Sequence, residues 1–138
     1  QARKMAQQKN IFMKLSGSED AIFINADGLH LKRLFLNLLN NAVKFTPTGG
    51  RININMRTEG RKLVVSIQDT GAGIKPEHMD KVFTRFFHEG TEAGSGLGLS
   101  IAQSIAKIHG GDISVKSQLY KGSTFTVTLL INAKVFSS

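Results

Sequence analysis

The stretch NLLNNAVKF, residues 37–45, is a helix-forming segment whose polar residues share one stripe. At about 100° per residue, Asn37, Asn41 and Lys44 fall within roughly 60° of one another on a helix. Apolar residues occupy other parts of the circumference: Leu34, Phe35, Leu38, Leu39 and Ala42. Asparagine is a poor helix former because its side chain competes for backbone hydrogen bonds. Two asparagines aligned with a lysine therefore indicate a polar ligand against this helix, the alternative being a solvated helix face.

The composition is that of one globular domain with a positive charge. The chain has 138 residues, 41% of them hydrophobic, and a net charge of +8 from 18 basic and 10 acidic residues. This excess favours an anionic partner, whether nucleotide, nucleic acid or membrane surface, but the basic residues are scattered, which disfavours a nucleic-acid interface. No apolar run approaches the roughly 18 residues of a membrane span. The absence of cysteine excludes disulfides, thiolate metal sites and cysteine catalysis.

The order of apolar patterns predicts an α+β fold. Strands are expected at 10–15, 21–25, 51–58, 62–69, 112–117 and 123–131. Helices are expected at 28–45 with Asp27 as N-cap, from Pro76 to about Phe83, and from the second glycine loop to about His109. The resulting order ββ-α-ββ-α-α-ββ indicates helices covering one face of a largely antiparallel sheet.

Two glycine-rich segments are candidates for phosphate binding. DTGAGI, residues 69–74, follows a predicted strand, and GSGLGLS, residues 94–100, opens a predicted helix. Free backbone N–H groups at a helix N-terminus bind phosphate, although ordinary turn chemistry explains each loop equally well. Neither the G-x-G-x-x-G fingerprint nor the G-x-x-x-x-G-K-[ST] loop is present. Any phosphate site in this chain must therefore use a different glycine pattern.

Asp69 stands where a strand ends and a tight turn begins. The commoner role for such a residue is to cap the turn. The alternative rests on the carboxylate, which only accepts hydrogen bonds and could bind an exocyclic amine such as that of adenine.

Together these segments resemble the ATP-binding catalytic domain of sensor histidine kinases, in the gyrase–chaperone–histidine kinase–MutL superfamily. NLLNNAVKFT resembles its N box, DTGAGI its G1 box, FTRFF its F box, GSGLGLS its G2 box, and GSTF (122–125) its last glycine box. Five motifs in the family's order are a specific signal. The resemblance implies a Bergerat-type fold, a two-layer α/β sandwich with a mixed, largely antiparallel sheet.

The resemblance also implies a role for each polar residue of the opening stretch. Asn41 would coordinate Mg²⁺ bridging the phosphates of ATP, Asn37 would support the metal site, Lys44 would contact phosphate and Phe45 would line the pocket. Asp69 would bond the adenine amino group. The other implied nucleotide-binding residues are Gly71, Gly73, Ile74, Phe83, Phe86, Gly94, Ser95, Gly96, Leu97, Gly98, Leu99 and Thr124.

Within this superfamily the residue at position 37 separates two chemistries. The hydrolysing members have Glu there as a base for water, whereas this chain has Asn, which cannot accept a proton. We therefore expect phosphoryl transfer to another nucleophile, with Asn37, Lys44, Arg85 and His88 as catalytic residues. His88 replaces an arginine that the family uses near the γ-phosphate, and Arg85 is expected to share that role. An ATPase or serine kinase of the same superfamily, and a basic nucleic-acid-binding module, are the alternatives.

The four histidines are His30, His78, His88 and His109, and none lies in a phosphoacceptor motif. The acceptor is therefore expected on a separate dimerisation and phosphoacceptor domain of the parent protein, with a response regulator downstream. Residues 1–9 are expected to end a linker, 10–132 to form the catalytic domain and 133–138 to form a tail. The resemblance implies a cytoplasmic domain of a membrane-anchored parent, without direct membrane contact. Residues 86–96 are expected to form a mobile lid.

Overall fold

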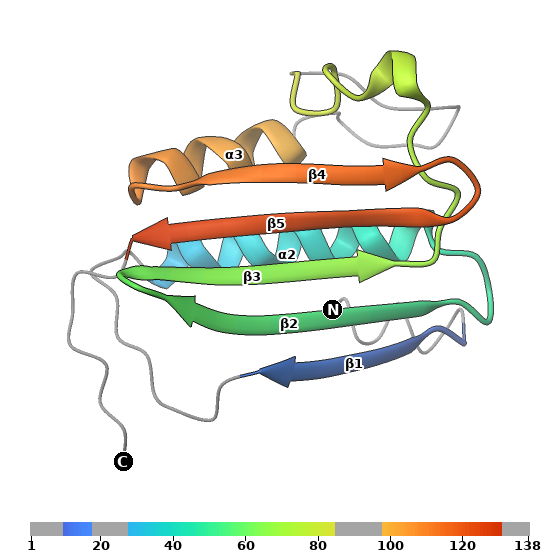
Figure 1. Ribbon diagram of the computed structural model, residues 1–138, viewed down its shortest axis with the longest axis horizontal. Coiled ribbons are helices and arrows are strands. Elements are labelled where there is room, and N and C mark those ends of the chain that lie inside the picture. The colour runs from blue at the N-terminus through green and yellow to red at the C-terminus, as the bar shows by residue number, and fades with distance from the viewer. Residues whose placement is uncertain (1–9, 18–27, 85–97, 131–138) are drawn as a thin grey trace.

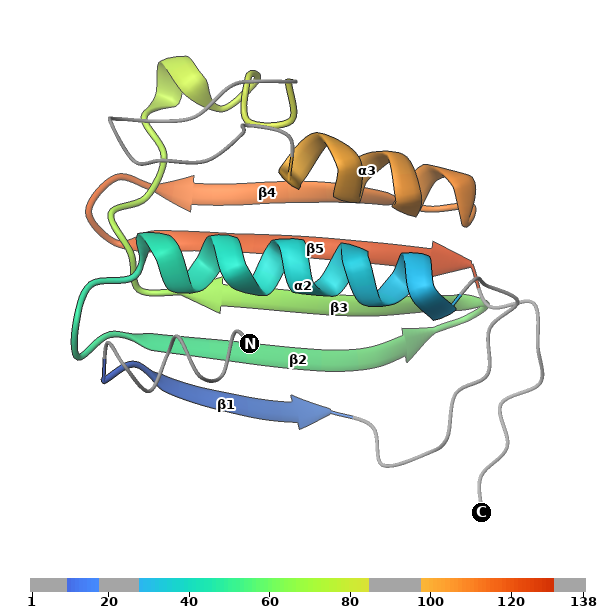
Figure 2. The same ribbon diagram turned by 180° about the vertical axis from the view of Figure 1, so that it is seen from behind.

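The fold was obtained as a computed structural model, which describes residues 10–17, 28–84 and 98–130. In this part of the chain, two α-helices cover one face of a five-stranded sheet (Figures 1 and 2). The elements are β1 (Phe12–Gly17), α2 (Gly28–Phe45), β2 (Arg51–Glu59), β3 (Lys62–Asp69), the short 3-10 helix η1 (Pro76–His78), α3 (Gly98–Ile108), β4 (Asp112–Gln118) and β5 (Gly122–Leu130). This arrangement confirms the α+β prediction.

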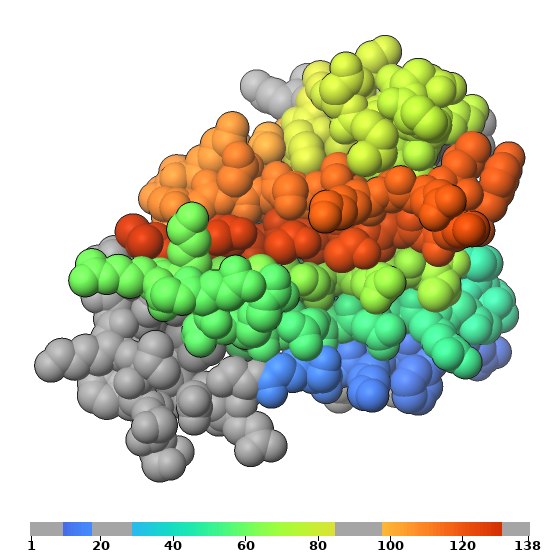
Figure 3. All heavy atoms as spheres, viewed as in Figure 1, coloured from blue at the N-terminus to red at the C-terminus, as the bar shows by residue number. Residues whose placement is uncertain are grey.

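The sheet has the order β1-β2-β3-β5-β4, so β3 is the central strand. β1 pairs with β2 in parallel, and all the other neighbours are antiparallel. The predicted hairpins of 51–58 with 62–69 and of 112–117 with 123–131 are both present, the latter described as far as Leu130. The other face of the sheet is not covered by α2 or α3 (Figure 3).

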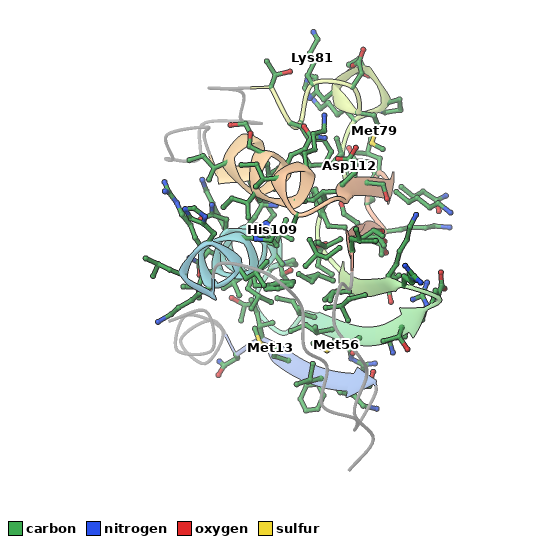
Figure 4. All side chains as sticks on the ribbon, turned by 90° about the vertical axis from the view of Figure 1, so that its left-hand side faces the viewer. Met13, Met56, Met79, Lys81, His109 and Asp112 are labelled. Atoms are coloured by element: carbon green, nitrogen blue, oxygen red, sulfur yellow. The ribbon has the colours of Figure 1, made fainter. Side chains whose placement is uncertain are left out.

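The hydrophobic core lies between the sheet and the two helices. Strands β3 and β5 alternate, so that Ile67 pairs with Phe125 and Val65 with Val127 on the covered face. Across from them, α2 contributes Leu34 and Leu38, which are 0% and 2% exposed. Met13 and Met56 pack against this core at the β1–β2 side (Figure 4).

Two predicted elements differ from the structure. The first strand is Phe12–Gly17 and not 10–15, because Asn10 has a positive φ of 54° and pairing with β2 starts at Phe12. The helix expected from Pro76 to about Phe83 is shortened to the three residues of η1. Hydrogen bonds there join residues three apart, as in His78 N to Lys75 O and Thr84 N to Lys81 O, and no α-helical ladder follows. The predicted strand at 21–25 and the cap at position 27 lie outside the described residues.

Candidate functional site

Three segments that are distant in sequence meet at one edge of the sheet (Figures 1 and 2). They are the C-terminal end of α2, the turn that follows β3 and the turn between β4 and β5. The end of α2 is fixed by Thr46, which is 0% exposed and donates its hydroxyl hydrogen to Ala42 O at 2.6 Å. Three of the five predicted motifs, the N box, the G1 box and the last glycine box, therefore meet at one place in the described part of the chain.

Asp69 is the only buried acidic side chain in the described part of the chain, at 6% exposure. Its Oδ1 accepts hydrogen bonds from the backbone N–H of Gly71 at 2.9 Å and of Ser123 at 3.3 Å. Its Oδ2 has no hydrogen-bond partner among the described residues. Burial raises the pKa of this carboxyl above its ordinary value of 3.8, and the two backbone hydrogen bonds partly oppose that rise. The carboxylate is thus anchored through one oxygen, and the other can accept a ligand's donor.

The turn that follows β3 contains the G1 box, residues 69–74, and is called the G1 turn below. It packs tightly because two of its residues are glycines. A Cβ on Gly71 would lie 2.5 Å from the carbonyl oxygen of Phe45. Gly73 has a φ of 77°, and a Cβ there would collide with the backbone of Gln118. These glycines let the turn lie against α2 on one side and against the β4–β5 turn on the other. Their expected close approach to a base stays a prediction.

The polar stripe of α2 lies beside the start of α3. Nδ2 of Asn37 donates to the carbonyl oxygen of Gly98 at 3.2 Å. Since a carbonyl only accepts, the amide nitrogen must face Gly98, and Oδ1 of Asn37 has no hydrogen bond in the described part of the chain. Asn41 is half-buried, and its side chain makes no hydrogen bond to any described residue. Lys44 is also half-buried, with Nζ 5.4 Å from the centroid of the Phe45 ring.

The charge distribution at the start of α3 favours an anion. The first turn of α3 contains no acidic residue, so the positive end of its dipole is not neutralised from within the helix. Among the described residues no group of three or more His, Asp or Glu could hold a metal ion. None of the described helices combines the length and the apolarity that crossing a membrane requires.

A surface pocket of about 460 Å³ opens beside the G1 turn. Its walls come from the end of α2, the G1 turn and the β4–β5 turn. The lining residues are Lys44, Phe45, Thr46, Pro47, Thr70, Gly71, Ala72 and Tyr120. The prediction that Phe45 faces a pocket agrees with this lining.

Other predicted site residues pack around the same edge. Ile74 is buried, and its N–H donates to Ser117 Oγ at 2.7 Å. Phe83 contacts Phe125 edge-to-face, with ring centroids 6.1 Å apart. Leu99 is partly buried against the core. The remaining predicted residues lie outside the described part of the chain: Arg85, Phe86, His88, Gly94, Ser95, Gly96 and Leu97. The expected lid at 86–96 lies there too.

The prediction that Thr124 lines the nucleotide pocket is wrong. It pairs with Gln68 and Lys116, both exposed, on the face of the sheet that the helices leave uncovered. The residue beside Asp69 is instead Ser123, which is 8% exposed and pairs with Asp69 across the strands. Strand alternation could have found it, because the core residue Phe125 and position 123 share a face.

Comparisons with known proteins agree with this geometry. Residues 26–133 match the model of the "Histidine kinase-, DNA gyrase B-, and HSP90-like ATPase" family. The chain belongs to this family. Its relatives include the sensor histidine kinase RppB of Synechocystis, 41% identical over 106 residues that cover 73% of this chain and 23% of RppB. The aerobic respiration control sensor protein ArcB of Escherichia coli is also 41% identical, over 110 residues covering 75% of this chain and 14% of ArcB.

Solved structures show the same fold. The mycobacterial sensor histidine kinase MprB superposes with a TM-score of 0.83 at 27% identity, covering 96% of this chain and 91% of that one. Full-length ShkA in complex with AMPPNP superposes with a TM-score of 0.85 at 28% identity, covering 96% of this chain and 28% of that one. The chain spans about a quarter or less of the lengths of RppB and ArcB. The chain is thus similar to the ATP-binding catalytic domains of sensor histidine kinases, and the predicted resemblance is confirmed.

Proposed function

We propose that this domain binds Mg-ATP at the edge described above and presents the γ-phosphate to a histidine on another domain of its parent protein. The observation that supports this most strongly is Asp69. A buried carboxylate with one oxygen held by two backbone N–H groups and one oxygen without a partner is suited to accept the exocyclic amine of adenine. Ser123 helps by orienting the carboxylate through its N–H.

The phosphates are proposed to lie along the polar stripe, toward the start of α3. Lys44 would contribute positive charge, and the dipole of α3 would favour the phosphate oxygens. Asn37 ties the two helices together through Gly98 O, so it fixes the separation of the walls of this phosphate site. In this proposal the base and the phosphates lie at two ends of one elongated site.

The residues at the phosphate end fit Mg²⁺. Two side chains there offer amide oxygens without hydrogen bonds in the described part of the chain, Asn41 Oδ1 and Asn37 Oδ1. Mg²⁺ prefers oxygen ligands, keeps several waters and takes few protein ligands beside phosphates. Asn41 would hold the ion, with Asn37 in support, and the bound ion would neutralise charge on the phosphates.

Phosphoryl transfer needs mainly positioning and charge neutralisation from such a domain. Asn37 cannot accept a proton, which disfavours activation of water. The acceptor histidine is proposed to lie on a dimerisation and phosphoacceptor domain, with a response regulator as the next acceptor. The cytoplasmic location and a membrane-anchored parent remain part of the same proposal. The name of RppB as a sensor histidine kinase supports a histidine as the acceptor.

The test of nucleotide binding is calorimetric titration of Mg-ATP into the domain and into an Asp69→Asn variant. The variant keeps the side chain's shape, but an amide NH₂ would replace one acceptor oxygen. If the amide oxygen keeps the N–H groups of Gly71 and Ser123, the NH₂ faces the adenine amine, donor against donor. A mismatched buried hydrogen bond costs about 1–3 kcal/mol, and more where a charge was involved, so affinity should fall about 10-fold to more than 100-fold.

A matched control is Asp112→Asn, which removes the same charge from the exposed start of β4, at the opposite end of that strand from the site. It should bind Mg-ATP as the unmodified domain does. Unchanged affinity in Asp69→Asn would refute the adenine assignment. Equal weakening in both variants would mean that only net charge matters.

A further inference from the structure

Tyr120 has a backbone conformation that is unusual for a bulky residue. Its φ is 66°, and the only other positive-φ residue besides glycine in the described part of the chain is Asn10. Asparagine enters this region readily, whereas tyrosine rarely does. Such residues persist when the surroundings impose the conformation, and they cluster at ligand-binding sites.

The conformation of Tyr120 is imposed by the G1 turn. Its backbone N–H donates to the carbonyl oxygen of Ala72 at 2.6 Å, which joins the β4–β5 turn to the segment following Asp69. The next residue, Lys121, donates its N–H to Gln118 O at 2.9 Å and closes the turn. The backbone of position 120 is therefore held from two sides.

The side chain of Tyr120 makes few stabilising contacts with the rest of the domain. Tyr120 is 84% exposed, and its ring has no aromatic or cation contact with any other described residue. It nevertheless lines the same pocket as Phe45 and Ala72. The ring thus stands at the rim of the pocket without serving the core.

We propose that Tyr120 forms an outer wall of the nucleotide site and packs its ring against the purine base. This inference rests on the proposed function. The base is the matching part of the ligand because the pocket joins the G1 turn, next to Asp69, whereas the phosphate end lies toward Asn37 and Gly98. Aromatic side chains stack on any nucleic-acid base, because every base has a π-face. A tyrosine ring has only two χ angles, so it loses little conformational freedom when it stacks.

The chain itself supplies the reporter for a test, because Tyr120 is its one tyrosine and it has no tryptophan. Tyrosine emission from the domain therefore comes from this ring alone. Titration with Mg-ADP should quench the emission, with the same midpoint as calorimetry. Free N-acetyltyrosinamide at the same nucleotide concentrations corrects for absorption by adenine. Inorganic tripolyphosphate, which has no base, should bind without quenching.

Three variants separate stacking from other effects. Tyr120→Phe should bind Mg-ADP within about 2-fold of the unmodified domain, whereas Tyr120→Leu, which keeps an apolar side chain but no ring, should bind about 3- to 10-fold more weakly. Tyr120→Gly should weaken binding similarly while raising the melting temperature, since glycine accepts a positive φ. A more stable but weaker binder cannot be explained by misfolding.

The outcomes distinguish this inference from the proposed function. Calorimetric binding that depends on Asp69 but produces no quenching, or that is unchanged in Tyr120→Gly, would overturn the role of Tyr120 alone. Equal affinity of the Leu and Phe variants would also overturn stacking. Absence of calorimetric binding in the unmodified domain would overturn both proposals.

Discussion

The contact between the G1 turn and the end of α2 makes Gly71 a position where a single methyl group should disturb both the fold and the hydrogen bond to Asp69. In Gly71→Ala the new Cβ would lie 2.5 Å from Phe45 O and 2.9 Å from Asp69 Oδ1. The first distance is roughly 1 Å inside an ordinary contact. Phe45 O is a backbone atom at a helix end, so it cannot rotate away. The turn has to shift, and the N–H of Gly71 shifts with it.

The expected cost follows from this geometry. Inserting a methyl group into a close-packed contact destabilises by about 1–3 kcal/mol. For a domain of this size each kcal/mol lowers the melting temperature by about 2–5 °C, so calorimetric melting of the nucleotide-free variant should show a decrease of about 2–15 °C. Because the shifted N–H anchors Asp69, affinity for Mg-ATP should fall as well, even at temperatures where the variant is fully folded.

Gly98→Ala is the matched control. Outside its own helix turn, the atom nearest to the new Cβ would be Asn37 Cγ, at 3.9 Å, which is an ordinary contact. Alanine is favoured over glycine inside a helix by about 0.5–1 kcal/mol, less in the first turn. Its melting temperature should stay level or rise. If Gly71→Ala melts at the same temperature as Gly98→Ala and binds Mg-ATP as tightly as the unmodified domain, the tight contact is not what positions Asp69.

Two other predictions concern Asp69 and Asn37. Since burial raises the pKa of Asp69 above the ordinary 3.8 of an unfolded chain, the folded domain keeps a proton that the unfolded chain has lost. Its contribution to stability therefore falls as pH rises through that interval and is level above it. Asp69→Asn should abolish this fall, so the melting temperature of the variant relative to the unmodified domain should rise as pH increases through about 3.8 and level off at higher pH. A difference that stays constant from pH 3.5 to 7 would contradict the pKa shift. For Asn37, steady hydrolysis of ATP by the domain should stay far below 1 s⁻¹, a rate near the low end for enzymes, and turnover at about that rate or faster would support an ATPase instead.

Much of the fold could be predicted because the local patterns agree with the tertiary structure. Helix 28–45 was predicted at its observed bounds, since its apolar residues Leu34 and Leu38 recur at helical spacing and become fully buried. The two hairpins were predicted from alternation. The first strand was misplaced by two residues because its start depends on pairing with β2, which no local pattern contains.

The site was harder to predict where it depends on how separate segments meet. The sequence identifies Asp69 and the asparagine stripe by residue type, but the hydrogen bond from Asn37 to Gly98 joins residues 61 positions apart. The sequence analysis named Thr124 for the pocket, whereas the alternation of β5 puts Ser123 on the face of Asp69. Tyr120 was overlooked because neither its positive φ nor its link to Ala72 leaves a signal in composition or periodicity.

The two ends of the proposed site differ in how they are built. Asp69 ends the central strand β3, and its neighbours Gly71 and Ser123 belong to segments hydrogen-bonded to that strand or to each other. The base end is therefore fixed by the end of the central strand and by the segments hydrogen-bonded to it. The phosphate end lies between two helices that pack against each other in the core, and there the side chain of Asn37 bridges them with a hydrogen bond at 3.2 Å. A change in the spacing of α2 and α3 would thus alter the phosphate contacts first and leave the base contacts in place. This division suits a kinase domain, because the nucleotide can stay bound through its base while the γ-phosphate is repositioned toward an acceptor.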